Sequence, residues 1–194
     1  MASEGFGSFA GPAGVSRAVT VRHLEMNSPS QLRPRRSSRQ DLHFTNMGVW
    51  PELNRFFYTA VGGEYYWVDR LAWTYDEWRA HLERSDIETW MLSAAGQPAG
   101  YAELHQQQNG SIEIAYFGLV PRFVGGGLGG HLLTVTTERA WQAGARRVWL
   151  HTCSLDHPAA LANYLARGFR EFHTETQHRL LPPEPLGPWP GARS

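Results

Sequence analysis

The chain has 194 residues, enough for one domain, and its 42% hydrophobic and 19% charged residues are typical of a globular protein. Its 18 basic and 18 acidic side chains cancel, so net charge gives no reason to expect nucleic acid or a membrane as a partner. All 18 basic residues are arginine, and the absence of lysine excludes P-loop hydrolases, protein kinases and pyridoxal or Schiff-base enzymes. The single cysteine, Cys153, excludes an intrachain disulfide and multi-cysteine metal sites.

Alternation, caps and turn residues predict the elements in chain order. The first are a strand over residues 19–24, a polar loop over 27–48 and a helix over 51–60. A capping box of Thr74 and Glu77 predicts a second helix, which continues to about residue 84. The remaining predictions are strands over 87–93, 99–105 and 111–120, a helix over 128–141, a strand over 147–153, a helix over 159–167 and a strand over 171–180.

This order predicts a single-domain α/β (α+β) fold over residues 18–181, with a mixed central sheet of six or seven strands and flanking helices. We expect residues 1–17 to be a flexible tail that lacks the features of a signal peptide, and 182–194 to be a proline-rich tail. No apolar run approaches the length of a membrane span, so we expect a soluble, cytoplasmic protein. Four arginines in the polar loop form either a solvated surface or a patch for an anionic ligand: Arg33, Arg35, Arg36 and Arg39.

A glycine run from Gly125 to Gly130 joins a predicted strand to a predicted helix. Glycines there let several backbone N–H groups approach a ligand, and the helix dipole adds positive potential, which favours phosphate or pyrophosphate. The run also satisfies the dinucleotide pattern G-x-G-x-x-G. That interpretation is weaker, because the strand ends near Val120, several residues early, and no acidic residue closes the next strand to hold a ribose.

The glycine run resembles the pyrophosphate loop of the GNAT superfamily, the acetyl-CoA-dependent N-acetyltransferases, whose pattern is R/Q-x-x-G-x-G/A. Gly127 and Gly129 match this pattern, whereas Val124 replaces the usual Arg or Gln. The family's fourth helix often carries N-x-x-A-x-x-x-Y-x-x-x-G-F, and here His157 replaces the Asn. The matching residues of that second motif are Ala160, Tyr164, Gly168 and Phe169. The resemblance covers residues 87–180 well.

The resemblance implies direct transfer of an acetyl group from acetyl-CoA to a primary amine of a small molecule or peptide, without a metal. The alternative is a catalytically silent acyl-CoA-binding module, which the departures at Val124 and His157 leave open. Acetyl-CoA and an amine acceptor are the implied partners, and a homodimer is left open. The implied cofactor-binding residues are Leu119 and Val120 through their backbone groups, with Val124, Gly125, Gly126, Gly127, Leu128, Gly129, Gly130, His157 and Asn163.

A general base is useful for this chemistry, because an alkyl amine with a pKa of about 10.4 is almost wholly protonated at neutral pH. Glu113 stands 12 residues before Gly125, a spacing that resembles the catalytic glutamate of the histone-acetyltransferase branch. Glu103 is the rival. A two-residue turn at Asn109 and Gly110 would pair Gln106 with Glu113, so the two glutamates would face opposite sides of the sheet.

Tyr164 is the expected acid that protonates the departing CoA thiolate, and its alternative role is that of a core tyrosine on an amphipathic helix. Cys153, with His151, Asp156 and His157 nearby in sequence, could form a thiol nucleophile or a metal site. We disfavour that interpretation, because a lone cysteine in a buried strand is more often a small core residue. The aromatic-rich region 50–90 would roof the acceptor site, and aromatic side chains exposed there would favour an apolar or aromatic amine.

Overall fold

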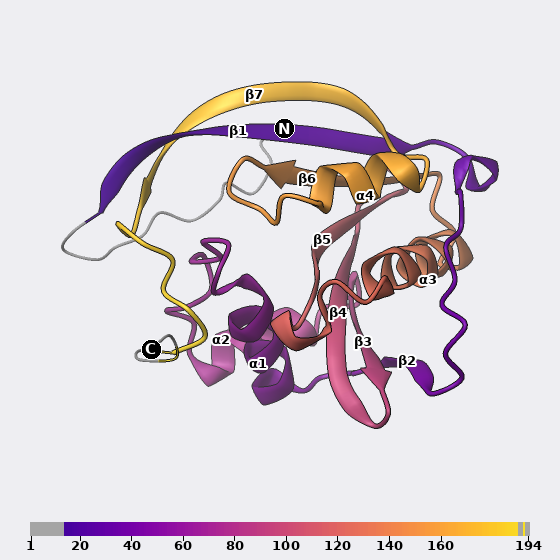
Figure 1. The fold of residues 1–194 in the computed structure, drawn as a ribbon, viewed down its shortest axis with the longest axis horizontal. Helices are drawn as coiled ribbons and strands as arrows, with labels where there is room; N and C mark the ends of the chain where they lie inside the picture. Colours follow the sequence, from indigo (N-terminus) through magenta and orange to yellow (C-terminus); the bar gives the residue numbers. More distant parts are fainter. Residues whose placement is uncertain (1–13, 190–191, 193–194) are drawn as a thin grey trace.

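The computed structural model describes residues 14–189 and 192, and within them the chain forms one mixed sheet of seven strands with four α-helices (Figure 1). The strand order is β2-β3-β4-β5-β6-β1-β7. Only β5 and β6 pair in parallel, and every other neighbouring pair is antiparallel. The α/β architecture expected from the sequence is therefore confirmed.

The elements extend or shorten the predicted ranges by a few residues. The strands are β1 (Val15–Met26), β2 (Leu42–Asn46), β3 (Ile87–Ala94), β4 (Gln97–Gln106), β5 (Ser111–Leu119), β6 (Arg147–Cys153) and β7 (Arg170–Leu181). The helices are α1 (Pro51–Gly62), α2 (Tyr75–Leu82), α3 (Leu128–Gln142) and α4 (Ala160–Ala166). The predicted capping box is present, since Thr74 Oγ1 accepts from the N–H of Glu77 and the Glu77 carboxylate accepts from the N–H of Thr74.

Two predicted boundaries are wrong. The stretch 27–48, expected to be a loop, contains β2, an edge strand whose side chains are exposed or half-buried and so lack a buried apolar face. β1 begins at Val15, so residues 15–17 belong to a strand and not to a tail, while residues 1–13 lie outside the described part of the chain.

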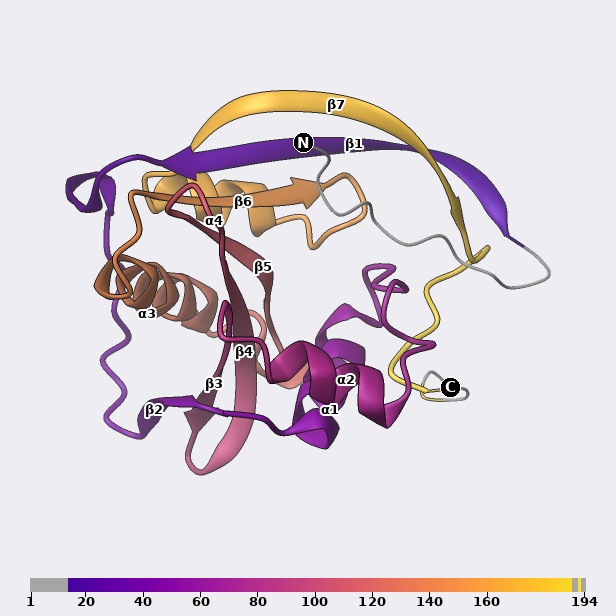
Figure 2. The ribbon, with the colours of Figure 1, turned by 180° about the vertical axis from the view of Figure 1, so that it is seen from behind.

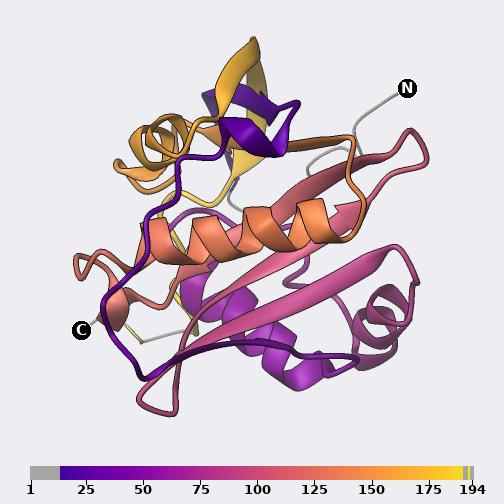
Figure 3. The same cartoon turned by 90° about the vertical axis from the view of Figure 1, so that its right-hand side faces the viewer.

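Helices cover both faces of the sheet. On one face α1 lies against the sheet (Figure 2), and its Phe57 and Val61 belong to one core cluster with Tyr101 of β4. On the other face, Leu133 of α3 lies in the main core cluster with residues of β4, β5 and β6, and α3 crosses the sheet diagonally (Figure 3). β4 consequently buries both faces over residues 99–104, whereas β6 alternates between buried and half-buried residues. None of the helices among the described residues has the length and apolarity needed to span a bilayer.

β1 and β7 run side by side as a long curved ribbon at one edge of the sheet (Figures 1 and 2). After β7 the chain returns to the end of α1, where the N–H of Gly187 donates to the carbonyl of Gly63 at 3.0 Å. A Cβ on Gly63 would lie 2.5 Å from the Gly187 backbone, so this contact is close. The described part of the predicted proline-rich tail 182–194 therefore has no helix or strand but packs against the domain.

Candidate active site

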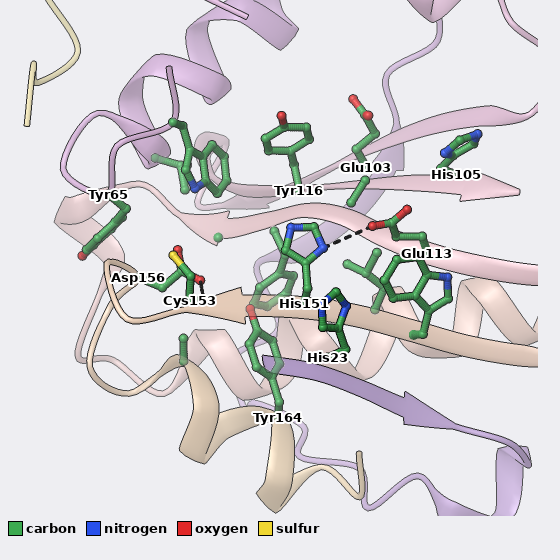
Figure 4. A pocket seen from close by; sticks show the side chains of 18 of the residues that line it. His23, Tyr65, Glu103, His105, Glu113, Tyr116, His151, Cys153, Asp156 and Tyr164 are labelled. Carbon is green, nitrogen blue, oxygen red and sulfur yellow. Dashed lines mark hydrogen bonds and ion pairs between the residues drawn. The ribbon is translucent and has the colours of Figure 1, made fainter. Parts of the chain in front are cut away.

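A cavity of about 1930 Å³ opens where β5 and β6 separate (Figure 4). The two strands pair only from Ser111 to Glu113, opposite Arg147 to Trp149. Beyond this point β5 stays paired with β4, and β6 stays paired with β1. Over the rest of β5, among the described residues, no strand pairs with the edge that faces β6, so its N–H and C=O groups are open to a ligand.

The open edge of β5 ends at Leu119. The N–H of Val120 donates to the Ala99 carbonyl at 2.9 Å, and the Val120 carbonyl accepts from the N–H of Phe123 at 2.8 Å. The N–H of Val120 is thus occupied, whereas its carbonyl can accept a second hydrogen bond, and the role of Val120 in cofactor binding stays a prediction. Because backbone groups of successive strand residues point in opposite directions, the N–H of Leu119 faces the separation between β5 and β6.

The glycine run forms the turn that leads from β5 into α3. Gly125 and Gly127 have φ of +89° and +76°, conformations that favour glycine, and Gly127 is the N-cap of α3. Gly125 and Gly129 line the cavity, as does Val124, which is 42% exposed. Backbone N–H groups at the beginning of α3 therefore lie beside the cavity, as an anion site requires.

Two arginines that the sequence analysis did not assign to this site lie beside the glycine run. A Cβ on Gly130 would lie 2.7 Å from Nη1 of Arg167 and 2.8 Å from Cδ of Arg35, so the absence of a side chain leaves room for both. Burial lowers the pKa of Arg167, and the charge of Arg35 lowers it further. Arg167 Nε is buried without a hydrogen-bond partner among the described residues. Two guanidinium groups and the positive end of α3 therefore converge on one region.

The polar segment before β2 brings Arg35 to this position. The N–H of Arg35 donates to Oγ1 of the buried Thr134 at 2.9 Å, which fixes the segment across α3. Arg36 instead bonds Glu138, and Arg39 bonds Asp41, so of the four clustered arginines only Arg35 lines the cavity. The sequence suggested that the four arginines could form a patch for an anionic ligand. It could not indicate which of them turns toward the cavity.

Both residues expected from the α4 motif line the cavity. Nδ2 of Asn163 donates to the Gly129 carbonyl at 3.3 Å, which ties α4 to the beginning of α3. Nδ1 of His157, at the position of the family's usual Asn, accepts from the N–H of Ala159 at 3.0 Å. The His157 ring also contacts the Tyr65 ring, with centroids 5.9 Å apart.

The hairpin between β4 and β5 differs from the predicted one. The N–H of Gln107 donates to the Ser111 carbonyl, so the loop has three residues and ends at Gly110, whose φ is +80°. Three-residue loops of this kind are a common alternative to the two-residue turn. Glu113 therefore pairs with His105 and not with Gln106, and a bulge at Ala115 then restores the pairing of Glu103 with Tyr116.

The register makes the expected opposition of the two glutamates wrong. His105 and Glu103 are two residues apart on β4, and Glu113 lies opposite His105, so both glutamates lie on one face. Both line the same cavity (Figure 4). Their partners, and not the direction in which they point, decide what each can do.

Glu103 is the buried counter-ion of Arg70. Two hydrogen bonds of 2.7 Å join the groups, His81 Nε2 lies 3.1 Å from Oε1, and the Glu103 side chain is 1% exposed. Burial alone would raise the pKa of Glu103, but the charge and hydrogen bonds of Arg70 hold it below its usual range. The Arg70 guanidinium also lies 4.3 Å from the centre of the Tyr116 ring. A carboxylate held in this way is a poor proton acceptor.

Glu113 makes longer contacts with its partners than Glu103 does. Its Oε1 lies 3.3 Å from Nδ1 of His151, and Gln107 Nε2 donates to its Oε2 at 3.3 Å. The Gln107 amide oxygen in turn accepts from Nε1 of Trp149 at 3.1 Å, which orients the amide. The Glu113 side chain is 13% exposed and faces the cavity beside His151 (Figure 4). His151 was considered only with Cys153 in the sequence analysis, because nothing local links it to Glu113.

Tyr164 enters from the opposite face, because its ring belongs to the core cluster beneath β5 and β6. It is 6% exposed and lines the cavity. Burial raises its pKa, and the charge of Asp156 acts in the same direction, so its hydroxyl remains protonated. Burial also raises the pKa of the Cys153 thiol to about 12, which disfavours a thiolate nucleophile there.

The aromatic residues of region 50–90 divide between core and cavity. Phe57, Tyr58 and Trp78 are buried, with 0–2% exposure. Others line the cavity in the loop between α1 and α2, namely Tyr65, Tyr66, Trp67 and Trp73. One wall of the cavity is therefore largely aromatic.

Comparison with known proteins gives a family match. The model of the acetyltransferase (GNAT) family matches residues 47–169, more than half of the chain. The comparison with curated proteins gave no match.

Solved structures share the fold at low sequence identity. A GCN5-related N-acetyltransferase from Kribbella flavida has a TM-score of 0.60 at 20% identity, over 85% of this chain and 60% of that one. A second GCN5-related N-acetyltransferase, from Sphaerobacter thermophilus, has a TM-score of 0.63 at 17% identity, over 89% of this chain and 54% of that one. An aminoglycoside acetyltransferase from an uncultured soil metagenomic sample has a TM-score of 0.55 at 12% identity, over 68% and 90%. This chain thus spans less than two thirds of the length of the first two proteins.

Glu103→Gln should destabilise the fold by about 3–5 kcal/mol, because it leaves the charge of Arg70 buried without its counter-ion. Urea unfolding of the variant and the wild type measures the difference. Asp76→Asn is the matched control: Asp76 is 82% exposed and 3.4 Å from Arg79, so its loss should leave stability nearly unchanged. Equal stability of Glu103→Gln and the wild type would contradict the structural role given to Glu103.

Proposed function

This chain belongs to the acetyltransferase (GNAT) family, and from that premise we propose that it transfers an acetyl group from acetyl-CoA directly to a primary amine of a small molecule or peptide. The observation that carries the proposal is the open edge of β5, which runs from Ile114 to Leu119 and leads toward the glycine run. An extended pantetheine arm can pair with such an edge as an added strand would. The family's usual co-substrate therefore has both a track for its arm and an anion site for its phosphates.

In this proposal the N–H groups from Gly125 to Gly130, with Leu128 at the first turn of α3, bind the pyrophosphate. Arg35 and Arg167 supply the side-chain positive charge that Val124 lacks. Their guanidinium groups suit phosphate oxygens, and the repulsion between them falls when an anion binds.

The reacting thioester would lie in the separation between β5 and β6. Leu119, at the open end of β5, would contact the part of the pantetheine arm nearer the glycine run, and an open-edge N–H of β5 closer to Glu113 would stabilise negative charge that develops on the thioester oxygen. Asn163 and His157 border the same space from the α4 side. Glu113 faces it from one side of the sheet and Tyr164 from the other, which suits two opposite proton transfers (Figure 4).

Glu113 and Tyr164 supply the two side-chain proton transfers of the reaction. Glu113 accepts a proton from the acceptor ammonium group, and the neutral nitrogen attacks the thioester carbonyl carbon. The tetrahedral intermediate collapses by breaking the carbon–sulfur bond, and Tyr164 gives its hydroxyl proton to the CoA thiolate. Burial keeps the Tyr164 hydroxyl protonated until that step. The attacking nitrogen releases its second proton, through solvent, to the Tyr164 phenolate, and Glu113 returns its proton to water, so the products are the amide, the CoA thiol and one proton. His151 is a positioning residue that holds the Glu113 carboxylate.

The deciding experiment measures acetyl-CoA binding by calorimetry and CoA thiol release with a panel of amines. The panel contains an alkyl amine, an aryl-alkyl amine, a peptide and an aminoglycoside, the last because one similar structure is an aminoglycoside acetyltransferase. The aromatic wall favours the aryl-alkyl amine over the alkyl amine. Amine-dependent thiol release supports the proposal. Tight acetyl-CoA binding without release for any amine would instead support the silent acyl-CoA-binding module.

Glu113→Gln should lower turnover by roughly 10²-fold or more at neutral pH, because the amide cannot accept the amine proton. The loss should shrink as pH rises toward the amine pKa of about 10.4, where more acceptor is already neutral. Turnover across pH and acetyl-CoA affinity by calorimetry are the measurements, and affinity should hold. An equal loss at every pH would remove Glu113 from the base role.

Tyr164→Phe should reduce turnover at least about tenfold while leaving acetyl-CoA affinity near normal. A thiolate can leave without assistance, so the effect is smaller than the loss of an obligatory group. The phenyl ring keeps its packing against Phe117 and Phe169, so thermal unfolding should change little. A folded, fully active variant would contradict the acid role, and an unfolded one would identify the hydroxyl as a structural donor.

Arg35→Gln and Arg167→Gln should each weaken acetyl-CoA binding by roughly tenfold or more, because a hydrogen bond to a charged group contributes about 1.5–3 kcal/mol. Calorimetry with the full chain measures the change. Arg36→Gln is the matched control, since Arg36 lies on the same segment but bonds Glu138. A loss with Arg36→Gln as large as with Arg35→Gln would show a general charge effect and not a site at the glycine run.

A further inference from the structure

A second group of polar side chains lies on the cavity wall beside His151, and none of its members takes part in the proposed reaction. It is formed by His23 of β1 with His173 and Glu175 of β7. His23 lies directly opposite His173 in the β1–β7 pairing, and Glu175 is two residues further along β7, on the same face. One ligand atom from each side chain lies within 4.8 Å of the other two.

The strand geometry holds His23 in place. Its side chain is 14% exposed, and its ring lies against those of Trp149 and Phe172, with centroids 6.1 Å and 5.9 Å away. Nε2 of His23 lies 3.3 Å from Oε1 of Glu175. The His23 ring thus already faces the Glu175 carboxylate, and His173 lies opposite His23 on β7.

We propose that His23, His173 and Glu175 bind one divalent transition-metal ion of the zinc class. Two imidazole nitrogens and one carboxylate oxygen form a donor set that zinc uses in sites with a fourth position open to solvent. Bonds of about 2.0–2.2 Å need the three groups to draw closer. His173 is exposed and the Glu175 side chain is 38% exposed, so both can turn toward the packed His23 ring.

The ion would join β1 to β7 across the ribbon that borders the cavity. It would also place positive charge beside His151, whose ring centroid is 6.0 Å from that of His23 and whose Nδ1 contacts Glu113. The donor set differs from the cysteine-based site that the sequence analysis disfavoured. Only the β1–β7 pairing brings it together, since His23 and His173 are far apart in the chain. The proposal does not rest on acetyl transfer.

The test titrates Zn²⁺ into the full chain, after chelation and desalting, and measures binding by calorimetry at neutral pH. Co²⁺ replaces Zn²⁺ in a parallel titration, because its visible absorption reports low-coordinate geometry. We expect one ion per chain, and a higher midpoint of thermal unfolding with Zn²⁺ present. His173→Gln and Glu175→Gln should each weaken binding by at least about tenfold, since even partners that only support a ligand contribute 10- to 100-fold.

His178→Gln is the matched control. His178 is an exposed histidine on the same strand, five residues from His173 and hence on the opposite face, and it does not line the cavity. The His178→Gln protein should bind Zn²⁺ with the affinity of the wild type. The proposal is overturned if the wild type shows no saturable one-to-one binding at micromolar Zn²⁺, if His173→Gln keeps wild-type affinity, or if His178→Gln loses as much as His173→Gln.

Discussion

The separation of β5 from β6 after three residue pairs is the constraint on which the candidate site depends. Each strand keeps its other partner, β4 for β5 and β1 for β6, so the gap costs only the few backbone hydrogen bonds between them. Those unmade bonds leave backbone donors and acceptors facing a cavity. The gap also lets Tyr164 reach the site from the helix side, while Glu113 and His151 reach it from the opposite face.

The cavity is further defined by a buried ion pair. Arg70, from the loop between α1 and α2, bonds both oxygens of Glu103 on β4 and lies over the Tyr116 ring of β5. The pair joins the aromatic loop to the sheet and leaves Glu113 as the cavity carboxylate with the weaker contacts. Glu103 therefore has a structural role, and Glu113 is left as the candidate for proton transfer, although both glutamates line the same cavity.

The charge at the glycine run comes partly from outside the family-matched residues 47–169. Arg35 belongs to the segment before β2, and the buried Thr134 hydroxyl fixes that segment on α3. Gly130 leaves room for Arg35 and for Arg167 at the end of α4. Where Val124 offers no positive charge, Arg35 and Arg167 bring positive charge to the glycine run from two other parts of the chain. A departure from a local motif can be compensated by residues that are distant in sequence.

The sequence by itself determined the elements whose signals are local: the Thr74 capping box, β6, and the glycine run at a strand–helix junction. It also identified Glu113 and Tyr164 as candidates, through motif spacing. These signals are local because caps, turns and positive φ depend on adjacent residues. Only the tertiary structure decided the register of β4 and β5, the partners of Glu103, the inward turn of Arg35 and the meeting of His23 with His173. Those features depend on loop closure, on a bulge and on packing between segments far apart in the chain, for which neighbouring residues carry no signal.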